Sequence, residues 1–422
     1  MPEIVKIKPK YRHKIIRNNK MKSMIDIPNH IRSDIDIFAD HILADPYPAF
    51  TELRDLGPAA FLNKYNVWHI GRFQETVQAL RDWQTFSSGS GCGLNDTINN
   101  IWSEALICED PPIHTEKRKL FDSRLSSAAL KPVEDIIDVR SEALVDTLLE
   151  KGDIDIVKDI AQDLPIHVVM DLIGWPEYVR PHLLAMGAHS LNSLGPNNPR
   201  TYSTFPKLEE IANLCNKVYE ENTLTEGGFG HTVAEAARAG HLPKEAVTGL
   251  LAGYVVAAFD TTISGISSGC WLFGQHPEEW DKLRKNPSLV KNAFTEILRL
   301  ESPIQHFARL TTKDVDMGEG ITIPKGSRVI VSYAAANRDE RQFQDPDTFD
   351  ITRPPKPTLS FSAGPHTCAG QGLARLEANA VFKAMAKRIR KIEITGEPVR
   401  ALDNITRGFD SIPARIVARA KK

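Results

Sequence analysis

One cysteine near the C-terminus lies in a loop whose composition suits a metal ligand. The run Phe361-Ser362-Ala363-Gly364-Pro365-His366-Thr367-Cys368-Ala369-Gly370 places glycines and an aromatic ring around a single thiol. A lone thiolate suits haem iron, because its electron donation favours O–O cleavage. Gly364 and Gly370 would let the backbone bend close to a porphyrin and turn N–H groups toward the sulfur, while Phe361 would shield it from water. The alternative is that Cys368 is simply a buried thiol.

The segments that must position this loop are mostly helical by pattern. Apolar residues recur at helical spacing over residues 132–151, 154–173 and 243–273. Two prolines in Asp45-Pro46-Tyr47-Pro48 suit the first turn of another helix. Aromatic and β-branched residues over 62–70, followed by a glycine, predict a strand and a turn. We therefore predict a mainly α fold with a small β portion.

The longest helical pattern, residues 243–273, carries polar residues within an apolar run. Asp260, Thr261, Thr262 and Ser264 interrupt it, which makes a membrane span an unsuitable interpretation. Polar side chains inside a buried helix need a reason, which the pattern by itself does not supply.

Composition describes an ordinary globular protein. The chain has 422 residues, 41% of them hydrophobic, and a formal net charge of −2, so nothing favours nucleic acid as a partner. Its five cysteines lack C-x-x-C spacing, which argues against a disulfide framework or a zinc site and fits a reducing cytoplasm. Residues 1–33 are basic without an apolar stretch, so we expect a flexible arm rather than a signal peptide or membrane anchor, followed by one domain over 34–422.

The cysteine loop matches F-x-x-G-x-x-x-C-x-G, the pattern of the cytochrome P450 family, at every fixed position. The resemblance extends from about Asp34 to the C-terminus. It implies the P450 fold, with haem b held between the long helix and the cysteine loop and Cys368 ligating the iron. It also implies a haem-thiolate monooxygenase, similar to bacterial members that lack a membrane anchor.

Further motifs acquire roles through this resemblance. Ala257-Ala258-Phe259-Asp260-Thr261-Thr262 resembles the sequence that activates oxygen, which implies that Ala257 lies beside the haem and that Asp260 and Thr261 deliver protons. Thr261 can also bond back to a carbonyl of the preceding turn. The alternative is that both polar residues only solvate or cap the helix.

Two groups of charged residues are implied to support the haem. Glu296-Ile297-Leu298-Arg299 resembles the E-x-x-R motif, joined by Arg353, in a structural role. The propionates are expected to bind His114 and Arg118, which match H-T-x-x-R, together with Arg309 and His366. Each of these residues alone would more often be a surface residue.

Residues 292–309, Asn337-Arg338-Asp339 and Gly227-Gly228-Phe229-Gly230 resemble the bacterial branch that O-demethylates small methoxylated aromatics such as para-methoxybenzoates. Members that bind benzoates hold the carboxylate with an arginine and with polar residues on the oxygen helix. This chain has Ser90 and Ala252-Gly253 at the corresponding positions, so a neutral substrate is favoured. The expected pocket wall comprises Ser90, Leu94, Asn95, Leu191, Leu194, Gly253, Val256, Phe259, Ile304, His306 and Phe307. Asn95 and His306 leave room for a polar substrate such as a methoxy sugar, and hydroxylation of another small molecule stays open.

The chain carries no flavin or NAD fingerprint beside the haem motifs, so electrons are expected from a ferredoxin and its reductase, using NADH or NADPH. Lys117, Lys119, Arg124 and Arg375 are the candidate docking patch, with ordinary solvated charges as the alternative. A peroxide-driven enzyme and a non-catalytic haem carrier are the rival functions. Retention of Asp260-Thr261 argues against the first, and NADH consumption would exclude the second.

Overall fold

The computed structural model describes residues 27–187 and 190–420. Most of the predicted basic arm lies outside the described residues. The boundary expected at Asp34 is too late, however, because Ile31 is completely buried and Arg32–Ser33 pairs with a strand at Phe61 and Leu62. The chain therefore joins the fold before its apolar pattern becomes evident.

Helices make up most of the structure, as predicted. The α-helices are α1 (Asp40–Ala44), α2 (Tyr47–Asp55), α3 (Phe73–Arg81), α4 (Asp96–Ile101), α5 (Ile113–Leu125), α6 (Ser127–Lys151), α7 (Asp163–Ile173), α8 (Arg180–Gly187), α9 (Pro199–Ser203), α10 (Phe205–Glu220), α11 (Phe229–Arg238), α12 (Lys244–Gln275), α13 (Pro277–Lys285), α14 (Val290–Glu301), α15 (Tyr333–Asn337) and α16 (Gln371–Arg388). Short 3₁₀ segments are η1 (Asn29–Ile31), η2 (Leu106–Cys108), η4 (Glu177–Val179), η5 (Ser190–Leu194), η6 (Pro287–Leu289) and η7 (Gly364–His366), and η3 (Val157–Ala161) is a short π-helix.

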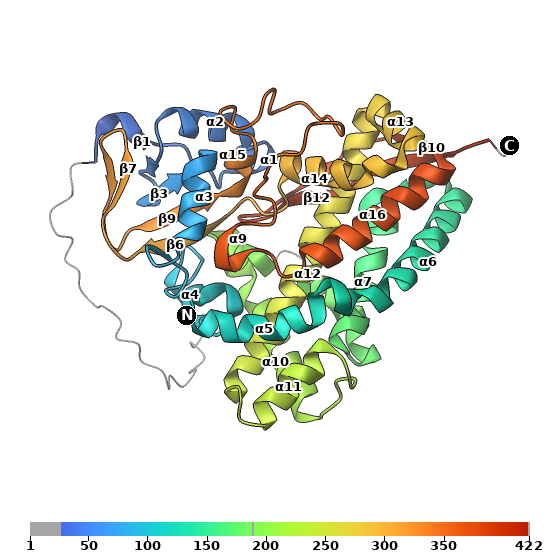
Figure 1. The fold of residues 1–422 in the computed structure, drawn as a ribbon, viewed down its shortest axis with the longest axis horizontal. Helices are drawn as coiled ribbons and strands as arrows, with labels where there is room; N and C mark the ends of the chain where they lie inside the picture. The colour runs from blue at the N-terminus through green and yellow to red at the C-terminus, as the bar shows by residue number, and fades with distance from the viewer. Residues whose placement is uncertain (1–26, 188–189, 421–422) are drawn as a thin grey trace.

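The strands form one larger sheet and three small ones. They are β1 (Arg32–Ser33), β2 (Ala60–Leu62), β3 (Val67–Ile70), β4 (Phe86–Ser87), β5 (Asp153–Asp155), β6 (His306–Thr311), β7 (Val315–Gly318), β8 (Ile321–Ile323), β9 (Arg328–Ser332), β10 (Ile389–Ile394), β11 (Val399–Leu402), β12 (Arg407–Ser411) and β13 (Pro413–Ala418). The larger sheet has the order β1-β2-β3-β9-β6-β4. Figure 1 shows these strands gathered on one side of the molecule and the long helices on the other.

Two predicted elements are divided in the structure. The segment 62–70 is a hairpin rather than one strand, because the chain turns between β2 and β3 at Asn66, whose φ is +53°. The segment 154–173 is not one α-helix, because Ile154 pairs with Ala414 of β13 before the chain forms a short π-helix and then α7. The strand at Ile154 could not be predicted locally, because the strand that it pairs with lies about 260 residues further along the chain.

Helix α12 is the central element that positions the candidate site. It spans Lys244–Gln275, close to the predicted 243–273, and contacts α7, α8, α10, α11 and α14 (Figure 1). By length and composition it could cross a membrane, yet 56% of its most apolar window is buried inside the protein. Other parts of the protein therefore cover most of this apolar surface.

The E-x-x-R motif forms the buried ion pair that its resemblance implied. Arg299, 1% exposed, donates two hydrogen bonds to Glu296 at 2.8 and 2.9 Å, and Arg353 reaches the same carboxylate at 3.0 Å. Arg299 also donates to the carbonyls of Asn337 and Pro346. Because these carbonyls belong to the segment before the cysteine loop, the motif ties that segment to α14.

Candidate functional site

The cysteine loop is closed by its own backbone and by a contact with α3. Cys368 N–H donates to the carbonyl of Phe361 at 2.9 Å, which brings the two ends of the loop together. Gly364 has a φ of +71°, and a Cβ there would lie 2.3 Å from the carbonyl oxygen of Leu80. Only glycine fits this position. The close approach to the carbonyl of Leu80 on α3 therefore requires glycine here, and the expected approach of the loop to a porphyrin stays a prediction.

The sulfur of Cys368 lies where backbone donors favour its ionised form. The N–H groups of Gly370 and Gln371 hydrogen-bond the thiol and lower its pKa, as do the nearby charges of Arg118 and Arg375. Burial is the larger effect and raises the pKa of Cys368. A buried thiolate therefore needs a further cation to be stable, and a metal ion bound to the sulfur supplies one.

Phe361 shields the loop together with a cation. The guanidinium of Arg375, on α16, lies 4.5 Å from the centre of the Phe361 ring, and burial lowers the pKa of this arginine. Such a cation above an aromatic face is attracted by the ring electrons. Arg375 therefore packs on the loop rather than standing free for a docking partner.

Three of the predicted propionate ligands come together beside the loop. The rings of His114 and His366 lie 4.4 Å apart, and the buried Nε2 of His366 has no hydrogen-bond partner among the described residues. Burial, followed by the charge of Arg309, lowers the pKa of His366 to about 2. Arg309 is itself only 3% exposed. An anionic group here would satisfy the orphaned nitrogen and offset the buried guanidinium, so the residues fit a haem propionate.

Arg118 has partners within the protein. Its guanidinium donates to the carbonyl of Thr367 at 2.6 Å and to Asp122 at 2.8 Å. The arginine therefore joins α5 to the cysteine loop next to the ligand position, and this contact supports the loop whether or not a propionate also binds.

One face of α12 is open although most of the helix is buried. Ala257 is exposed, and a Cβ at Gly253 would meet nothing within 4 Å. Thr261 Oγ donates to the carbonyl of Ala257 at 2.8 Å, as predicted for a hydroxyl in a helix. Residues 253, 257 and 261 are four apart and share one face, with Asp260 at its edge. The haem would lie between this face and Cys368, and would supply oxygen activation when bound.

Two residues assigned to the pocket wall face elsewhere. Phe259 is completely buried and packs against Gly187 of α8, because it lies on the side of α12 opposite Ala257. His306 packs edge-on against Phe38 at 5.6 Å. Its neighbour Phe307 contacts Tyr333 instead, since successive strand residues alternate in direction. Phe259 and His306 were therefore wrongly placed in the wall.

His306 makes stability depend on pH. Both ring nitrogens are buried without a hydrogen-bond partner among the described residues, and burial lowers the pKa to about 4. The unfolded chain, with a pKa near ~6.5, binds more protons between these values, so stability falls as pH falls. The wild-type protein should therefore lose roughly 3 kcal/mol of unfolding free energy through His306 between pH 6.5 and 4, and His306→Gln should not show this loss.

Urea unfolding at several pH values across this range measures the difference. The exposed His241, changed to Gln, is the matched control, and an unchanged slope in His306→Gln would contradict the prediction.

The loop that carries Leu94 and Asn95 contacts the segment of Leu194, as the predicted pocket wall requires. The side chain of Asn95, however, forms its hydrogen bonds within the protein. Leu94 N–H donates to the carbonyl of Leu194 at 2.9 Å. The Asn95 amide donates to the carbonyls of Ser193 and Gly195, and its oxygen caps α4. Leu191 and Leu194 are buried on η5. Asn95 therefore fixes the closed loop, and the polarity expected from it is not available to a substrate.

Sequence reasoning missed an arginine next to Ser90. Ser90 is exposed, and its carbonyl accepts a hydrogen bond from Arg328 at 3.2 Å, while the Gly91 carbonyl accepts another at 2.8 Å. Arg328 begins β9, more than two hundred residues along the chain, so no local pattern could reveal the contact. Its donors hold the loop backbone.

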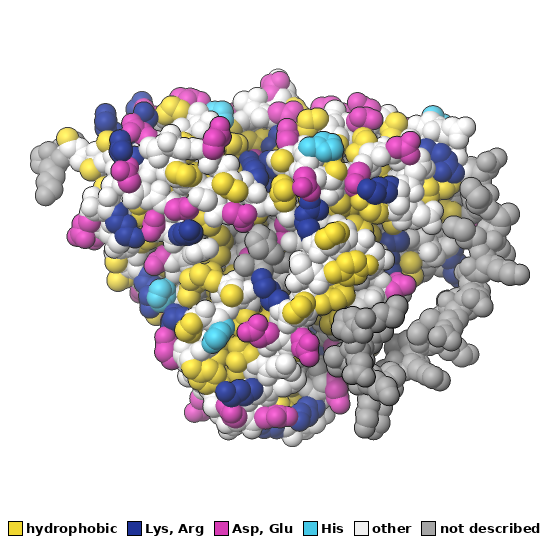
Figure 2. Space-filling model, turned by 180° about the vertical axis from the view of Figure 1, so that it is seen from behind, with side chains coloured by type: hydrophobic (Ala, Val, Ile, Leu, Met, Phe, Trp, Pro, Cys, Tyr) yellow, Lys and Arg dark blue, Asp and Glu magenta, His cyan; other side chains and the backbone are white. Residues whose placement is uncertain are grey.

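The predicted docking patch does not form as one surface. Lys117 is 4% exposed and pairs with Glu109 at 2.5 Å and Glu104 at 3.2 Å. Arg124 donates to the Thr232 hydroxyl at 2.9 Å, which leaves Lys119 as the exposed member. The reverse face of the molecule, seen in Figure 2, shows basic and acidic side chains interspersed.

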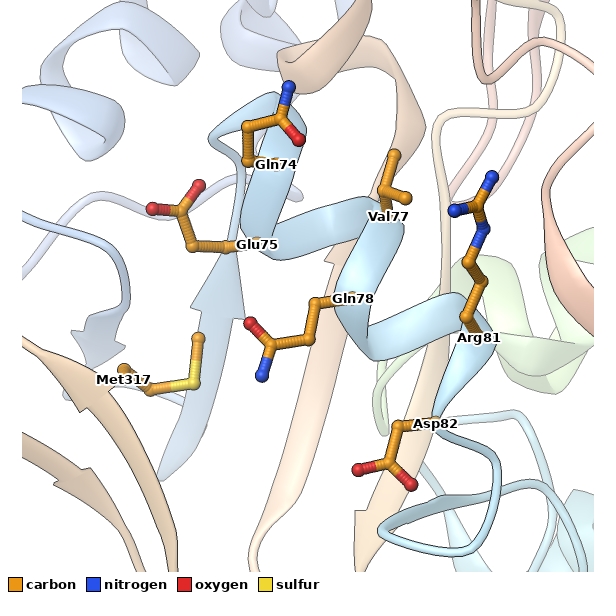
Figure 3. A pocket seen from close by; sticks show the side chains of 7 residues that line it. All are labelled: Gln74, Glu75, Val77, Gln78, Arg81, Asp82 and Met317. Carbon is orange, nitrogen blue, oxygen red and sulfur yellow. The ribbon is translucent and has the colours of Figure 1, made fainter.

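A surface hollow of about 610 Å³ lies along α3, close to the cysteine loop at Arg81 but with none of the predicted site residues in its lining. Figure 3 shows its lining: Gln74, Glu75, Val77, Gln78, Arg81, Asp82 and Met317. Most of these side chains are polar and come from a single helix. The hollow does not include Cys368 or the open face of α12, so it is not the candidate site.

Comparison with known proteins agrees with this geometry. Residues 230–400 match the cytochrome P450 family model. Cytochrome P450 CYP199A2 of Rhodopseudomonas palustris is 37% identical, over 90% of this chain and 93% of the relative. The 6-deoxyerythronolide B hydroxylase of Saccharopolyspora erythraea is 28% identical over 90% of this chain and 98% of its own length.

Solved structures share the fold. P450BioI, in complex with an acyl carrier protein ligated to hexadec-9Z-enoic acid, has a TM-score of 0.81 and 26% identity, covering 89% of this chain and all of P450BioI. CYP109Q5 from Chondromyces apiculatus has a TM-score of 0.79 and 26% identity, covering 93% of this chain and 100% of that protein. With the cysteine loop, the open face of α12 and the E-x-x-R ion pair in place, the chain belongs to the cytochrome P450 family and is a haem b monooxygenase.

Proposed function

We propose that this monooxygenase O-demethylates a small, neutral, methoxylated molecule with O₂ and electrons from a ferredoxin and its reductase. One oxygen atom enters the methyl C–H bond, and the product then releases formaldehyde and leaves an alcohol. The other oxygen atom leaves as water, which consumes two protons and two electrons. The proposal rests on the resemblance of the sequence to O-demethylating members and on the charges around the open face of α12.

The open face of α12 is the observation that carries the choice of a neutral substrate. Gly253 and Ala257 offer small, apolar surface, and the charged group at the edge of this face is an acid, Asp260. A buried carboxylate next to it would lack a counter-charge. Arg328, which lies beside Ser90 at the predicted clamp position, donates to backbone carbonyls.

Charge selection can be tested by titrating the haem spin-state change. We expect 4-methoxyphenol to bind roughly 100-fold more tightly than 4-methoxybenzoate, because desolvating an unpaired carboxylate costs several kcal/mol and each ~1.4 kcal/mol is tenfold in affinity. A methyl-ether sugar is titrated alongside to separate aromatic from sugar substrates. Tighter binding of the benzoate would contradict a neutral substrate.

A gain-of-function variant sharpens the same test. The space around Gly253 admits a side chain, so Gly253→Arg places a cation on the open face and should move the preference toward the benzoate. Gly253→Leu adds similar bulk without charge and is the matched control. An equal effect of both variants would mean that volume, and not charge, decides selection.

The source of electrons is tested separately. Turnover should require NADH or NADPH together with a ferredoxin and reductase, because the chain retains the Asp260-Thr261 pair whose proposed role is to deliver protons during oxygen activation. Full turnover with hydrogen peroxide and no redox partner would favour the peroxide-driven alternative.

A further inference from the structure

Two cysteines that are distant in sequence face each other in the core. The sulfur atoms of Cys92 and Cys108 lie 3.2 Å apart, closer than two sulfurs in ordinary van der Waals contact, so one thiol hydrogen-bonds the other. Cys92 is completely buried and Cys108 is 2% exposed. The pair has no part in the ligand set or proton delivery described above.

The pKa values of two other buried thiols are shifted in the opposite direction from that of Cys92. Cys215 and Cys270 lie in apolar surroundings, and burial raises the pKa of each to about 12. In contrast, the hydrogen bond from Cys108 lowers the pKa of Cys92, assisted by the charges of Arg309 and Arg328. A thiol that ionises more easily reacts more readily with an oxidant. A second thiol in contact with it can then react with the oxidised sulfur to form a disulfide.

The two cysteines bracket the loop that covers the predicted substrate side. Cys92 is anchored because its carbonyl accepts a hydrogen bond from Ala308 of β6 at 2.9 Å. Cys108 ends η2, shortly before α5. Residues 93–107 between them include α4 and the segment whose Leu94 and Asn95 bond to η5. A bond between the two sulfurs would make these residues a closed loop.

We propose that Cys92 and Cys108 form a reversible disulfide that closes the 93–107 loop in the presence of a peroxide. The Cys92 thiolate attacks one peroxide oxygen, which gives a sulfenic acid and, after proton transfer, the first water. The sulfur of Cys108 then displaces the hydroxyl group, so that the S–S bond forms and a second water leaves. Two thiols are oxidised by two electrons and one hydrogen peroxide is reduced. A dithiol reductant reverses the step by exchange.

The oxidant reaches the pair through local opening of the loop, a low-energy motion relative to global unfolding. The sulfurs need to approach by only about 1 Å to reach the bond length near 2.05 Å. The cross-link then limits loop opening, which couples peroxide level to ligand access.

Mass spectrometry of the haem-loaded protein tests the proposal. After mild hydrogen peroxide, quenching and denaturing alkylation, we expect the intact protein to lose two hydrogen masses and two alkylation sites, with one peptide pair linking Cys92 to Cys108. Dithiothreitol should restore both sites. Amide hydrogen exchange of residues 93–107 should be slower in the oxidised form than in the reduced form.

Matched variants separate the pair from other thiols. Cys92→Ser and Cys108→Ser should each abolish the mass loss, whereas Cys215→Ser should retain it. Absence of a linked peptide in the wild-type protein, or a link to another cysteine, would overturn the proposal even if the serine variants did not fold. Unchanged exchange over 93–107 in a linked protein would overturn the coupling to loop opening.

Discussion

Cys368→Ser should abolish the red-shifted Soret band of the reduced carbon monoxide complex, together with turnover. A serine hydroxyl stays protonated where a thiol ionises, and it lacks the electron donation that the thiolate gives to haem iron. The amides of Gly370 and Gln371 point at this sulfur, so the loop is arranged for an anionic ligand. The measurement is the difference spectrum of the reduced protein with and without carbon monoxide.

Cys270→Ser is the matched control for this substitution. Cys270 is completely buried on α12 and ionises with difficulty, because burial raises its pKa to about 12. This variant should keep the red-shifted band at full intensity per haem. If Cys368→Ser kept the band as well, another side chain would be the iron ligand.

Thr261→Ala should bind substrate and consume NADH while most electrons appear as hydrogen peroxide. The Thr261 hydroxyl lies on the open face of α12 and donates to the carbonyl of Ala257 at 2.8 Å, and we propose that it passes on a proton that Asp260 delivers. Losing a positioned proton donor of this kind costs about 10²- to 10⁴-fold in the step it serves. The ratio of product formed to NADH consumed, with peroxide measured in parallel, gives the result.

Two neighbouring substitutions make this experiment specific. Thr261→Ser retains a hydroxyl at the same position and should restore much of the coupling. Thr262→Ala removes the next hydroxyl, which is buried on another side of the helix, and should leave coupling unchanged. Equal coupling in Thr261→Ala and the wild-type protein would remove Thr261 from proton delivery.

Contacts within short motifs could be predicted from the sequence, because the residues that form them are close together in the chain. The cysteine loop, the E-x-x-R pair and the Thr261 back-bond each depend on residues within a few positions, and the structure confirms the geometry of all three. Helix α12 was predicted within two residues at its C-terminal end, because a long apolar period is a strong signal.

Contacts between distant segments could not be predicted in the same way. Asn95 appeared to be a polar pocket residue until its amide was found on the backbone of η5, a hundred residues further on. Lys117 was predicted to be a surface charge, yet it is buried and pairs with the mostly buried Glu109 and the more exposed Glu104. Residue type alone does not reveal which partners satisfy a polar group.

The sequence by itself thus determined the family and the order of the supporting motifs and predicted Cys368 as the iron ligand, because each is encoded by neighbouring residues. Only the tertiary structure decided which side chains face the site. It turned His306 and Phe259 away, placed Arg328 on the Ser90 loop and brought Cys92 to Cys108. The physical reason is that side-chain direction follows from helix phase, strand alternation and long-range packing, which are settled only when the whole core is assembled.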